Sequence, residues 1–333
     1  MNIGFDGKRA ANNLTGLGNY SRSLIAQLAK HFHQNHYFVY SPKVKNDPQV
    51  NTFFADSKVQ LKRPAANVPK LMWRSFGIKK QLQQDGIHLF HGLSQEIPVG
   101  IQKTGIKSVV TIHDLIYLRF PAYYKAIDRY IYHKKSQYAC VNSDHIVAIS
   151  ERTKQDIIHY YQVPEEKITV IYQGCDAAFK KEYTSEEKLI VLNRYSLPLK
   201  YILIVGTIEP RKNLMLLVRA MKDINPDFKL VVVGKPQAYA SLVKKEIERL
   251  DLTERILFLE GLPFADLPMV YQMASLFIYP SLYEGFGIPI IEALHSRVPV
   301  IAATGSCLEE AGGPDSIYIS PTDANELATQ ANR

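Results

Sequence analysis

The sequence of 333 residues has little cysteine, a single tryptophan and no long apolar run. Its three cysteines, Cys140, Cys175 and Cys307, lie far apart without a CxxC pair, so their spacing predicts neither a zinc site nor a disulfide framework. Apolar runs such as 202–205 and 230–233 are far shorter than the roughly 20 residues that span a bilayer. Any membrane contact is therefore expected to be peripheral.

A secretion signal is also lacking in the printed sequence. Residues 1–6, MNIGFD, have the pattern of a strand and leave no room for a charged leader followed by an apolar segment. The composition, 46% hydrophobic and 22% charged, is that of an ordinary globular protein. The length predicts two domains. We therefore expect a cytoplasmic protein of two domains.

Positive charge is concentrated in the first half of the chain. The net charge is +8, and residues 1–180 hold 24 Lys/Arg against 13 Asp/Glu, whereas residues 181–333 hold 16 against 19. We find no nucleic-acid-binding signature among these lysines and expect no nucleic-acid partner. A solvated basic surface, an anionic acceptor and an anionic membrane surface all fit the excess, and these alternatives stay open.

Short apolar segments of strand length alternate with segments of helix length in two series, which predicts an α/β protein with two doubly wound parallel sheets. The predicted strands are 3–6, 36–40, 87–90, 109–113, 145–149 and 168–171, then 202–205, 230–233, 256–259, 276–278 and 300–301. In the first series, helices are predicted at 71–84 and 122–140, and two more are predicted to start near Asn19 and at Ser150. Ser150 suits the N-cap position of its helix. We expect Rossmann-like domains at 1–175 and 201–333, joined by a connection at 176–200.

A pair of glycines follows the first predicted strand. Residues 15–20, TGLGNY, place Gly16 and Gly18 before a helix, whose free N–H groups and dipole favour phosphate. An ordinary loop that needs a positive φ at a glycine fits equally well. A dinucleotide-binding domain would need an acidic residue after the second strand, but residues 40–43, YSPK, contain none. The dehydrogenase alternative is therefore disfavoured.

Two glutamates follow the predicted strand at 276–278. In residues 283–293, YEGFGIPIIEA, the glycines disfavour helix and Pro289 suits a first helical turn. This predicts Glu284 in a loop and Glu292 inside a helix. They are not expected to face each other as a glycosidase pair does.

The chemistry of this segment suits a sugar nucleotide. Backbone N–H groups around Gly285, Phe286, Gly287 and Ile288 can approach an anion closely. Two separate carboxylates can accept hydrogen bonds from sugar or ribose hydroxyls. Alternatively, Glu292 only complements the N-terminus of its helix.

Adjacent cations follow the first predicted strand of the second series. Residues 206–214, GTIEPRKNL, place Arg211 and Lys212 at the C-terminal end of that strand, where α/β sheets bind ligands. A forked guanidinium and a mobile ammonium can together neutralise a diphosphate leaving group without a metal. A solvated helix start with two cations is the alternative.

These motifs together resemble the retaining glycosyltransferases of family 4, also called group 1, and the resemblance covers nearly the whole chain. The family's pattern of Glu, seven residues and Glu matches residues 284–292 without a gap. The resemblance implies the GT-B fold, in which two Rossmann-like domains face a central cleft. It also implies an enzyme that takes a sugar from a nucleotide diphosphate carrier, with no cofactor or metal.

The resemblance also implies roles for individual residues. Glu284 is expected to act on the transferred sugar, and Arg211 and Lys212 on the diphosphate. His113 ends a predicted strand, and a histidine at this place faces the donor sugar in similar enzymes, so it is also expected to be catalytic. The donor-binding residues are Glu292 on the ribose, Gly206, Gly285 to Ile288, and Gly16, Leu17 and Gly18, which close from the opposite domain. Without the resemblance, a lone histidine such as His113 is more often satisfied by a local hydrogen bond.

The run 209–213, EPRKN, looks most like mannosyltransferases that use GDP-mannose. This implies transfer of a hexose to a glycan or lipid-linked acceptor in polysaccharide or envelope glycan synthesis. A UDP-sugar-dependent transferase and a non-catalytic nucleotide-sugar-binding protein are the alternatives. Similar enzymes continue beyond the apparent helix that contains residues 326–333, so we expect the C-terminal domain to be truncated.

Residues 70–80, KLMWRSFGIKK, mix basic and large apolar side chains on a predicted helix. At helical spacing Leu71, Ser75 and Ile78 share one side, so the apolar residues form no single stripe. A core-packed helix with solvated lysines and a helix that rests on anionic lipid are both compatible with this pattern.

Overall fold

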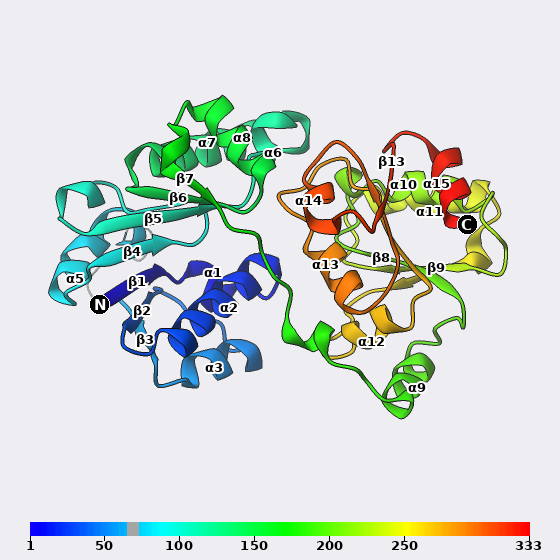
Figure 1. Cartoon of the computed structure of the whole chain (residues 1–333), viewed down its shortest axis with the longest axis horizontal. Coiled ribbons are helices and arrows are strands. Elements are labelled where there is room, and N and C mark those ends of the chain that lie inside the picture. Colours follow the sequence, from blue (N-terminus) through cyan, green and yellow to red (C-terminus); the bar gives the residue numbers. More distant parts are fainter. Residues whose placement is uncertain (65–72) are drawn as a thin grey trace. The chain divides into compact units, whose positions relative to one another are not determined.

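The computed structural model describes residues 1–64 and 73–333. These residues form two compact units, Met1–Tyr172 and Gln173–Arg333 (Figure 1). Each unit has one parallel sheet with a hydrophobic core on each face, which confirms the predicted pair of doubly wound α/β folds. Among the described residues, no helix combines the length and apolarity needed to cross a bilayer.

In the described part of the first unit, the sheet has seven strands in the order β3-β2-β1-β4-β5-β6-β7. They are β1 (Asn2–Asp6), β2 (His36–Tyr40), β3 (Val59–Lys62), β4 (Leu89–Gly92), β5 (Lys107–Ile112), β6 (His145–Ala148) and β7 (Ile168–Val170). The helices are α1 (Lys8–Asn12), α2 (Gly16–His31), α3 (Pro48–Ala55), α5 (Ile78–Gln84), α6 (Ile116–Arg119), α7 (Ala126–Asn142) and α8 (Glu151–Tyr161). Alternate residues of β2 enter opposite cores, Val39 on one face and Tyr40 on the other.

The described second unit has a six-stranded sheet in the order β10-β9-β8-β11-β12-β13. The strands are β8 (Tyr201–Val205), β9 (Lys229–Val233), β10 (Ile256–Leu259), β11 (Leu276–Tyr279), β12 (Val300–Ala303) and β13 (Ile317–Ile319). The helices are α9 (Ser185–Arg194), α10 (Leu214–Ala220), α11 (Tyr239–Arg249), α12 (Leu267–Gln272), α13 (Ile288–His295), α14 (Leu308–Gly312) and α15 (Ala324–Ala331). Along β8, Ile202 and Leu203 point into opposite cores.

Some boundaries differ from those the sequence predicts. The strands β3 and β13 were not predicted, because both are short edge strands that are only partly buried. Helix α2 begins at Gly16 rather than near Asn19. The predicted N-cap of α8 is confirmed, since the Ser150 hydroxyl accepts a hydrogen bond from the Thr153 N–H.

The segment 176–200, expected to be a connection, belongs to the second unit. It contains α9, and Phe179, Val191 and Leu197 are buried in the core beneath β8. These apolar side chains explain why the segment packs on the second sheet despite its charged sequence.

Candidate functional site

The second unit brings two loops together at the C-terminal ends of β8 and β11. These strands are neighbours in the sheet although two other strands separate them in sequence, which is where doubly wound sheets form ligand sites. The Leu282 N–H donates to the Arg211 carbonyl at 2.8 Å. The Asn213 side-chain amide donates to the Pro280 carbonyl at 3.1 Å. The loops 206–213 and 280–287 are therefore fixed to each other.

Arg211, Lys212 and Glu284 form one ion cluster on these loops. Lys212 Nζ lies 2.6 Å from Glu284 Oε1, and Arg211 Nη1 lies 2.7 Å from Glu284 Oε2. Arg211 Nη2 also binds Glu209 Oε1 at 2.6 Å. The resemblance placed Arg211 and Lys212 on the diphosphate and Glu284 on the sugar of the donor. In the structure, both cations contact the Glu284 carboxylate directly.

The electrostatics of the cluster keep all its ions charged at neutral pH. Burial raises the pKa of Glu284, but Lys212 and Arg211 outweigh burial and hold the pKa at about 2. Burial lowers the pKa of Lys212, whereas Glu284 and Tyr279 raise it, so the net shift is upward. Glu284 is therefore a hydrogen-bond acceptor and not a proton donor.

Three residues outside the predicted set support this cluster. Glu209 holds Arg211, and the Tyr279 hydroxyl accepts a hydrogen bond from Lys212 Nζ at 2.5 Å. The Cys307 thiol donates to the carbonyls of Glu284 and Phe286 at 3.1 and 3.0 Å. Tyr279 could have been predicted as a site residue, because it is the last residue of β11 and ligand sites lie at the C-terminal ends of such strands. No local sequence pattern marks Cys307 as a site residue.

Backbone geometry explains two glycines of the second unit's motifs, Gly206 and Gly287. Gly287 caps α13 at a φ of +131°, and a Cβ there would lie 3.1 Å from the Ala311 Cβ. Gly206 has a φ of +150°. Both conformations favour glycine. Pro289 lies in the first turn of α13, which confirms Glu284 in a loop and Glu292 inside a helix.

Glu292 lies in a separate environment from Glu284. Its Oε2 accepts a hydrogen bond from the Tyr271 hydroxyl at 2.9 Å. Burial raises the pKa of Glu292, the Tyr271 hydrogen bond lowers it and Asp176 raises it, with a result of about 7. The two glutamates therefore have different partners and opposite pKa shifts, which suits different roles.

In the first unit, the glycine pair lies in the first turn of α2. Neither Gly16 nor Gly18 has a positive φ, so a loop that needs such a φ is the wrong explanation. A Cβ on Gly18 would lie 1.8 Å from the Asn13 carbonyl oxygen, whereas a Cβ on Gly16 would meet nothing within 4 Å. The close approach of the Asn13 backbone explains why residue 18 is glycine. That Gly16 and Leu17 bind the nucleotide-sugar donor stays a prediction.

His113 follows β5 and is buried beside α2. Its Nε2 binds the Leu93 carbonyl at 2.9 Å, and the Tyr20 ring packs edge-on at 4.8 Å between centroids. Burial lowers the pKa of His113 to about 4, so the ring is neutral at physiological pH. Tyr20 comes from the TGLGNY motif, so the structure brings that motif and His113 together.

A second histidine joins this cluster. His91 Nε2 lies 2.9 Å from the Thr111 hydroxyl, which lies 3.1 Å from the Tyr20 hydroxyl. Burial, with a smaller contribution from His113, lowers the pKa of His91 to about 4. The sequence left His91 unassigned because only the pairing of β4 with β5 brings it to Thr111.

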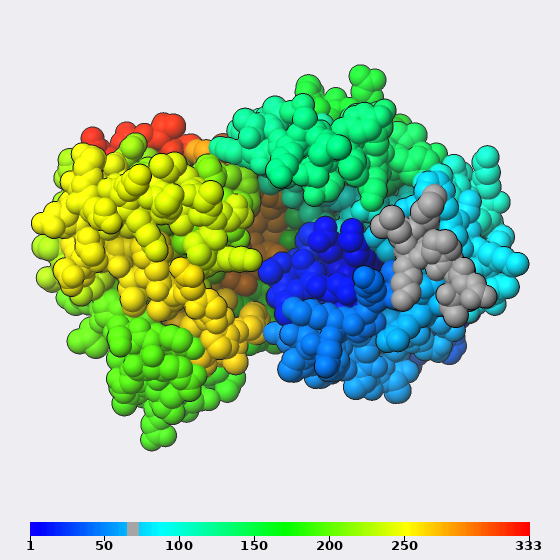
Figure 2. Space-filling model, turned by 180° about the vertical axis from the view of Figure 1, so that it is seen from behind, coloured from blue at the N-terminus to red at the C-terminus, as the bar shows by residue number. Residues whose placement is uncertain are grey.

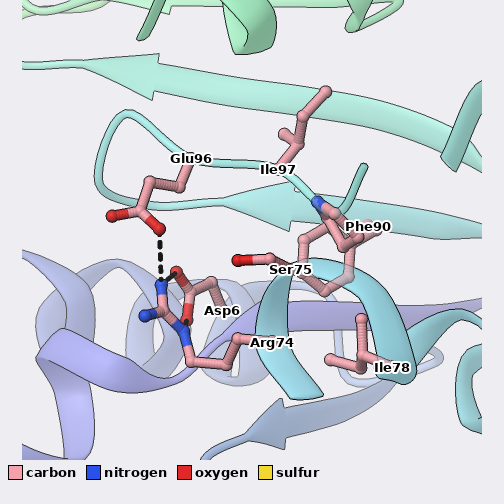
Figure 3. A pocket seen from close by; sticks show the side chains of 8 residues that line it. Asp6, Arg74, Ser75, Ile78, Phe90, Glu96 and Ile97 are labelled. Carbon is pink, nitrogen blue, oxygen red and sulfur yellow. Dashed lines mark hydrogen bonds and ion pairs between the residues drawn. The ribbon is translucent and has the colours of Figure 1, made fainter. Parts of the chain in front are cut away.

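Figure 3 shows a small pocket of the first unit in which Arg74 lies between Asp6 and Glu96. Arg74 Nε and Nη2 donate to the two Asp6 carboxylate oxygens at 3.0 and 2.6 Å, and Nη2 donates to Glu96 Oε2 at 3.2 Å. A neighbouring pocket of about 240 Å³ shares Glu96 and is also lined by Lys135 and Tyr138.

The described part of the segment 70–80 fits the core-packed interpretation. Trp73 and Ile78 are buried in the hydrophobic core, and Arg74 is engaged in ion pairs. Phe76 is exposed. Lys70 and Leu71 lie outside the described residues.

In the described ranges 1–64 and 73–333, no group of three or more His, Cys, Asp or Glu side chains is arranged to hold a metal ion. The expected independence of a metal stays a prediction.

Comparisons with known proteins cover both units. Residues 14–179 match the family model described as Glycosyltransferase Family 4, and residues 193–333 match Glycosyl transferases group 1. The chain is 28% identical over 334 aligned residues to O-antigen chain mannosyltransferase B of Escherichia coli, covering 95% of this chain and 85% of that protein. It is 29% identical over 216 residues to O-antigen chain mannosyltransferase RfbU of Salmonella typhimurium strain LT2, covering 64% and 57%.

Solved structures show the same fold. A crystal structure of Anabaena HepE in complex with UDP and glucose aligns with a TM-score of 0.73 at 19% identity, covering 100% of this chain and 89% of that one. A glycosyltransferase from Rickettsia africae aligns with a TM-score of 0.75 at 19% identity, covering 99% and 86%. With both family models matched and the GT-B fold confirmed, the chain belongs to glycosyltransferase family 4, the group 1 glycosyltransferases.

Proposed function

We propose that this protein is a retaining hexosyltransferase that transfers mannose from GDP-mannose to a hydroxyl of a glycan or lipid-linked acceptor. The observation that carries the proposal is the cluster of Arg211, Lys212 and Glu284 at the ends of β8 and β11. It combines cations for a diphosphate with a carboxylate for sugar hydroxyls, and loop-to-loop hydrogen bonds hold it in place.

The proposed chemistry is the departure of a nucleoside diphosphate from a sugar with oxocarbenium-ion character. Negative charge grows on the diphosphate, and Arg211 and Lys212 stabilise it without needing a metal. The ionised Glu284 accepts hydrogen bonds from the sugar, and Glu292 accepts them from the ribose. For retention, the acceptor attacks from the face of the leaving group, and a phosphate oxygen removes its proton.

The acceptor is proposed to bind the first unit. The pocket of about 240 Å³ supports this assignment, because its lining combines the Glu96–Lys135 ion pair with apolar side chains, a mixture that suits the hydroxyls and the apolar faces of a sugar ring. We place the enzyme in the cytoplasm, with peripheral contact to anionic membrane, as suits an acceptor for polysaccharide or envelope glycan synthesis.

The choice of mannose rests on the EPRKN run and on the similarity to the O-antigen mannosyltransferases of E. coli and Salmonella. The test is competitive binding of GDP, UDP and ADP, followed by turnover of GDP-mannose with a hydroxylated acceptor. We expect GDP to bind most tightly and the product to retain the donor's anomeric configuration by NMR. Preference for UDP would favour the UDP-sugar alternative, and binding without turnover would favour a non-catalytic binding protein.

A further inference from the structure

The hydroxyl of Tyr20 belongs to a hydrogen-bond chain that crosses three elements of the first unit. It lies 3.1 Å from the Thr111 hydroxyl on β5, which lies 2.9 Å from His91 Nε2 on β4. Thr111 is fully buried. Burial raises the pKa of Tyr20, although the hydrogen bond to Thr111 lowers it, and the net shift is upward. The phenol therefore stays protonated at physiological pH, and the chain fixes the position of its oxygen.

The ring of Tyr20 passes this constraint on to His113. The two ring planes meet at 90°, and their centroids lie 4.8 Å apart, an arrangement that aromatic rings prefer to face-to-face stacking. The Leu93 carbonyl binds His113 Nε2 at 2.9 Å and so holds one edge of the imidazole. The perpendicular Tyr20 ring is a further constraint, which acts on the tilt of the imidazole plane.

Tyr20 also connects His113 to the glycine turn at the start of α2. Thr15 and Gly16 are exposed there, and this start belongs to the blue N-terminal part of the chain that is open to view in Figure 2. Tyr20 lies about one helical turn further along and reaches the sheet through its contact with Thr111. A ligand at the glycine turn would therefore meet the same helix that constrains His113.

Other groups hold α2 in place. Near its start, Arg22 Nη1 donates to the Asn13 carbonyl at 2.8 Å. At its end, the Tyr37 hydroxyl donates to the carbonyl of Phe32, the C-cap residue, at 2.8 Å. Loss of the Tyr20 hydroxyl should therefore release the Tyr20 ring and leave the helix where it is.

We propose that Tyr20 is a positioning residue for sugar transfer, and that Thr111 and His91 act through it to set the orientation of His113. This inference rests on the proposed transfer reaction and on the expected place of His113 at the donor sugar. Neither Tyr20 nor His91 belongs to the predicted site. A shift of about 1 Å at a reacting site can lower the rate by about 100-fold, so a modest error in the imidazole orientation is large enough to measure.

The test is steady-state kinetics with the donor that the parent turns over. Tyr20→Phe keeps the ring and removes the hydroxyl, so kcat should fall by about 10-fold with the donor KM within about twofold of the parent value. Thr111→Val interrupts both hydrogen bonds and should lower kcat by about the same factor. Thr111→Ser keeps the hydroxyl and should restore the parent rate. Because each variant interrupts the same chain, Tyr20→Phe/Thr111→Val should be no slower than Thr111→Val, and a combined loss of about 100-fold would contradict a single chain.

Action through His113 has a readout of its own. His113→Ala should lower kcat by itself, and the addition of Tyr20→Phe should cause no further loss in that background. A loss of about 10-fold that persists without the imidazole would show that Tyr20 does not act through His113.

The matched control is Tyr37→Phe, which removes the hydroxyl at the other end of α2 and should keep the parent kcat. Melting temperatures of all variants separate loss of folding from loss of positioning. Parent-like kcat in both Tyr20→Phe and Thr111→Val, or an equal fall in Tyr37→Phe, would overturn the inference while turnover by the parent upholds the proposed function. A parent that turns over no nucleotide sugar would overturn both.

Discussion

Glu284 Oε1 and Lys212 Nζ lie 2.6 Å apart although 72 residues separate them in sequence. With Arg211 on the other carboxylate oxygen, the cluster is largely neutralised before any donor is present. A diphosphate must therefore share cations that already have a partner. Mutations can therefore test the positive charge of Arg211 and the negative charge of Glu284 one at a time.

Arg211→Ala should lower kcat by about 100-fold, because it removes a donor that stabilises the leaving diphosphate. Steady-state kinetics with the preferred donor measure this change. The matched control is Arg219→Ala in the same unit, whose exposed side chain pairs with Glu246 at the surface. Parent-like kcat in Arg211→Ala would remove Arg211 from the diphosphate site.

Glu284→Gln should lower kcat by a similar factor of about 100 while nucleoside diphosphate binds at least as well as to the parent. The amide no longer neutralises Arg211 and Lys212, so their positive charge becomes available to the diphosphate. Calorimetric titration and kinetics together check this split, with circular dichroism as the test of folding. Markedly weaker binding in a folded variant would contradict it.

Glu292→Gln should weaken nucleoside diphosphate binding by about 10-fold, as expected for loss of a charged hydrogen-bond acceptor. Because the pKa of Glu292 is about 7, the carboxylate forms as the pH rises, and binding to the parent should strengthen between about pH 6 and pH 8. The variant should lack this part of the pH dependence. A 2′,3′-dideoxynucleoside diphosphate is the control, since it keeps the phosphates and lacks the ribose hydroxyls.

The same pKa has a consequence for stability. Burial raises the pKa of Glu292 from 4.5 to about 7, so its contribution to folding is fully present below the unfolded value and is lost as the pH rises through 7. Glu292→Gln removes this titration. Its melting temperature should therefore fall less than that of the parent between about pH 5 and pH 8, and an identical fall would show that Glu292 titrates normally.

Activity should survive chelation, because Arg211 and Lys212 can supply the charge that a metal would otherwise provide. Turnover measured after extensive dialysis against EDTA tests this expectation. Complete loss of activity that manganese restores would overturn it.

Gly18→Ala should destabilise the first unit by about 1–3 kcal/mol, because the added methyl group would collide with the backbone of Asn13. Gly16→Ala is the control in the same helical turn, where a Cβ meets nothing within 4 Å. Thermal or urea unfolding should separate the two variants clearly. Equal stability of both would show that α1 and α2 can move apart at no cost.

Local sequence predicted much of the fold and the position of the motifs. Strand β2 was predicted at its observed bounds, and Ser150 was identified as a helix N-cap. Both features depend on a few adjacent residues. The edge strands β3 and β13 escaped prediction because they are only four and three residues long and their side chains are only partly buried.

The sequence by itself determined that Glu284 would lie in a loop and Glu292 in a helix, because Gly287 and Pro289 constrain the backbone between them. Only the tertiary structure decided what each carboxylate touches. The strand order places β8 beside β11 and so brings Lys212 to Glu284, whereas Glu292 is buried and accepts a hydrogen bond from Tyr271. Strand order and burial arise from the packing of the whole unit, which is why the opposite pKa shifts of two glutamates in one motif could not be predicted from the motif alone.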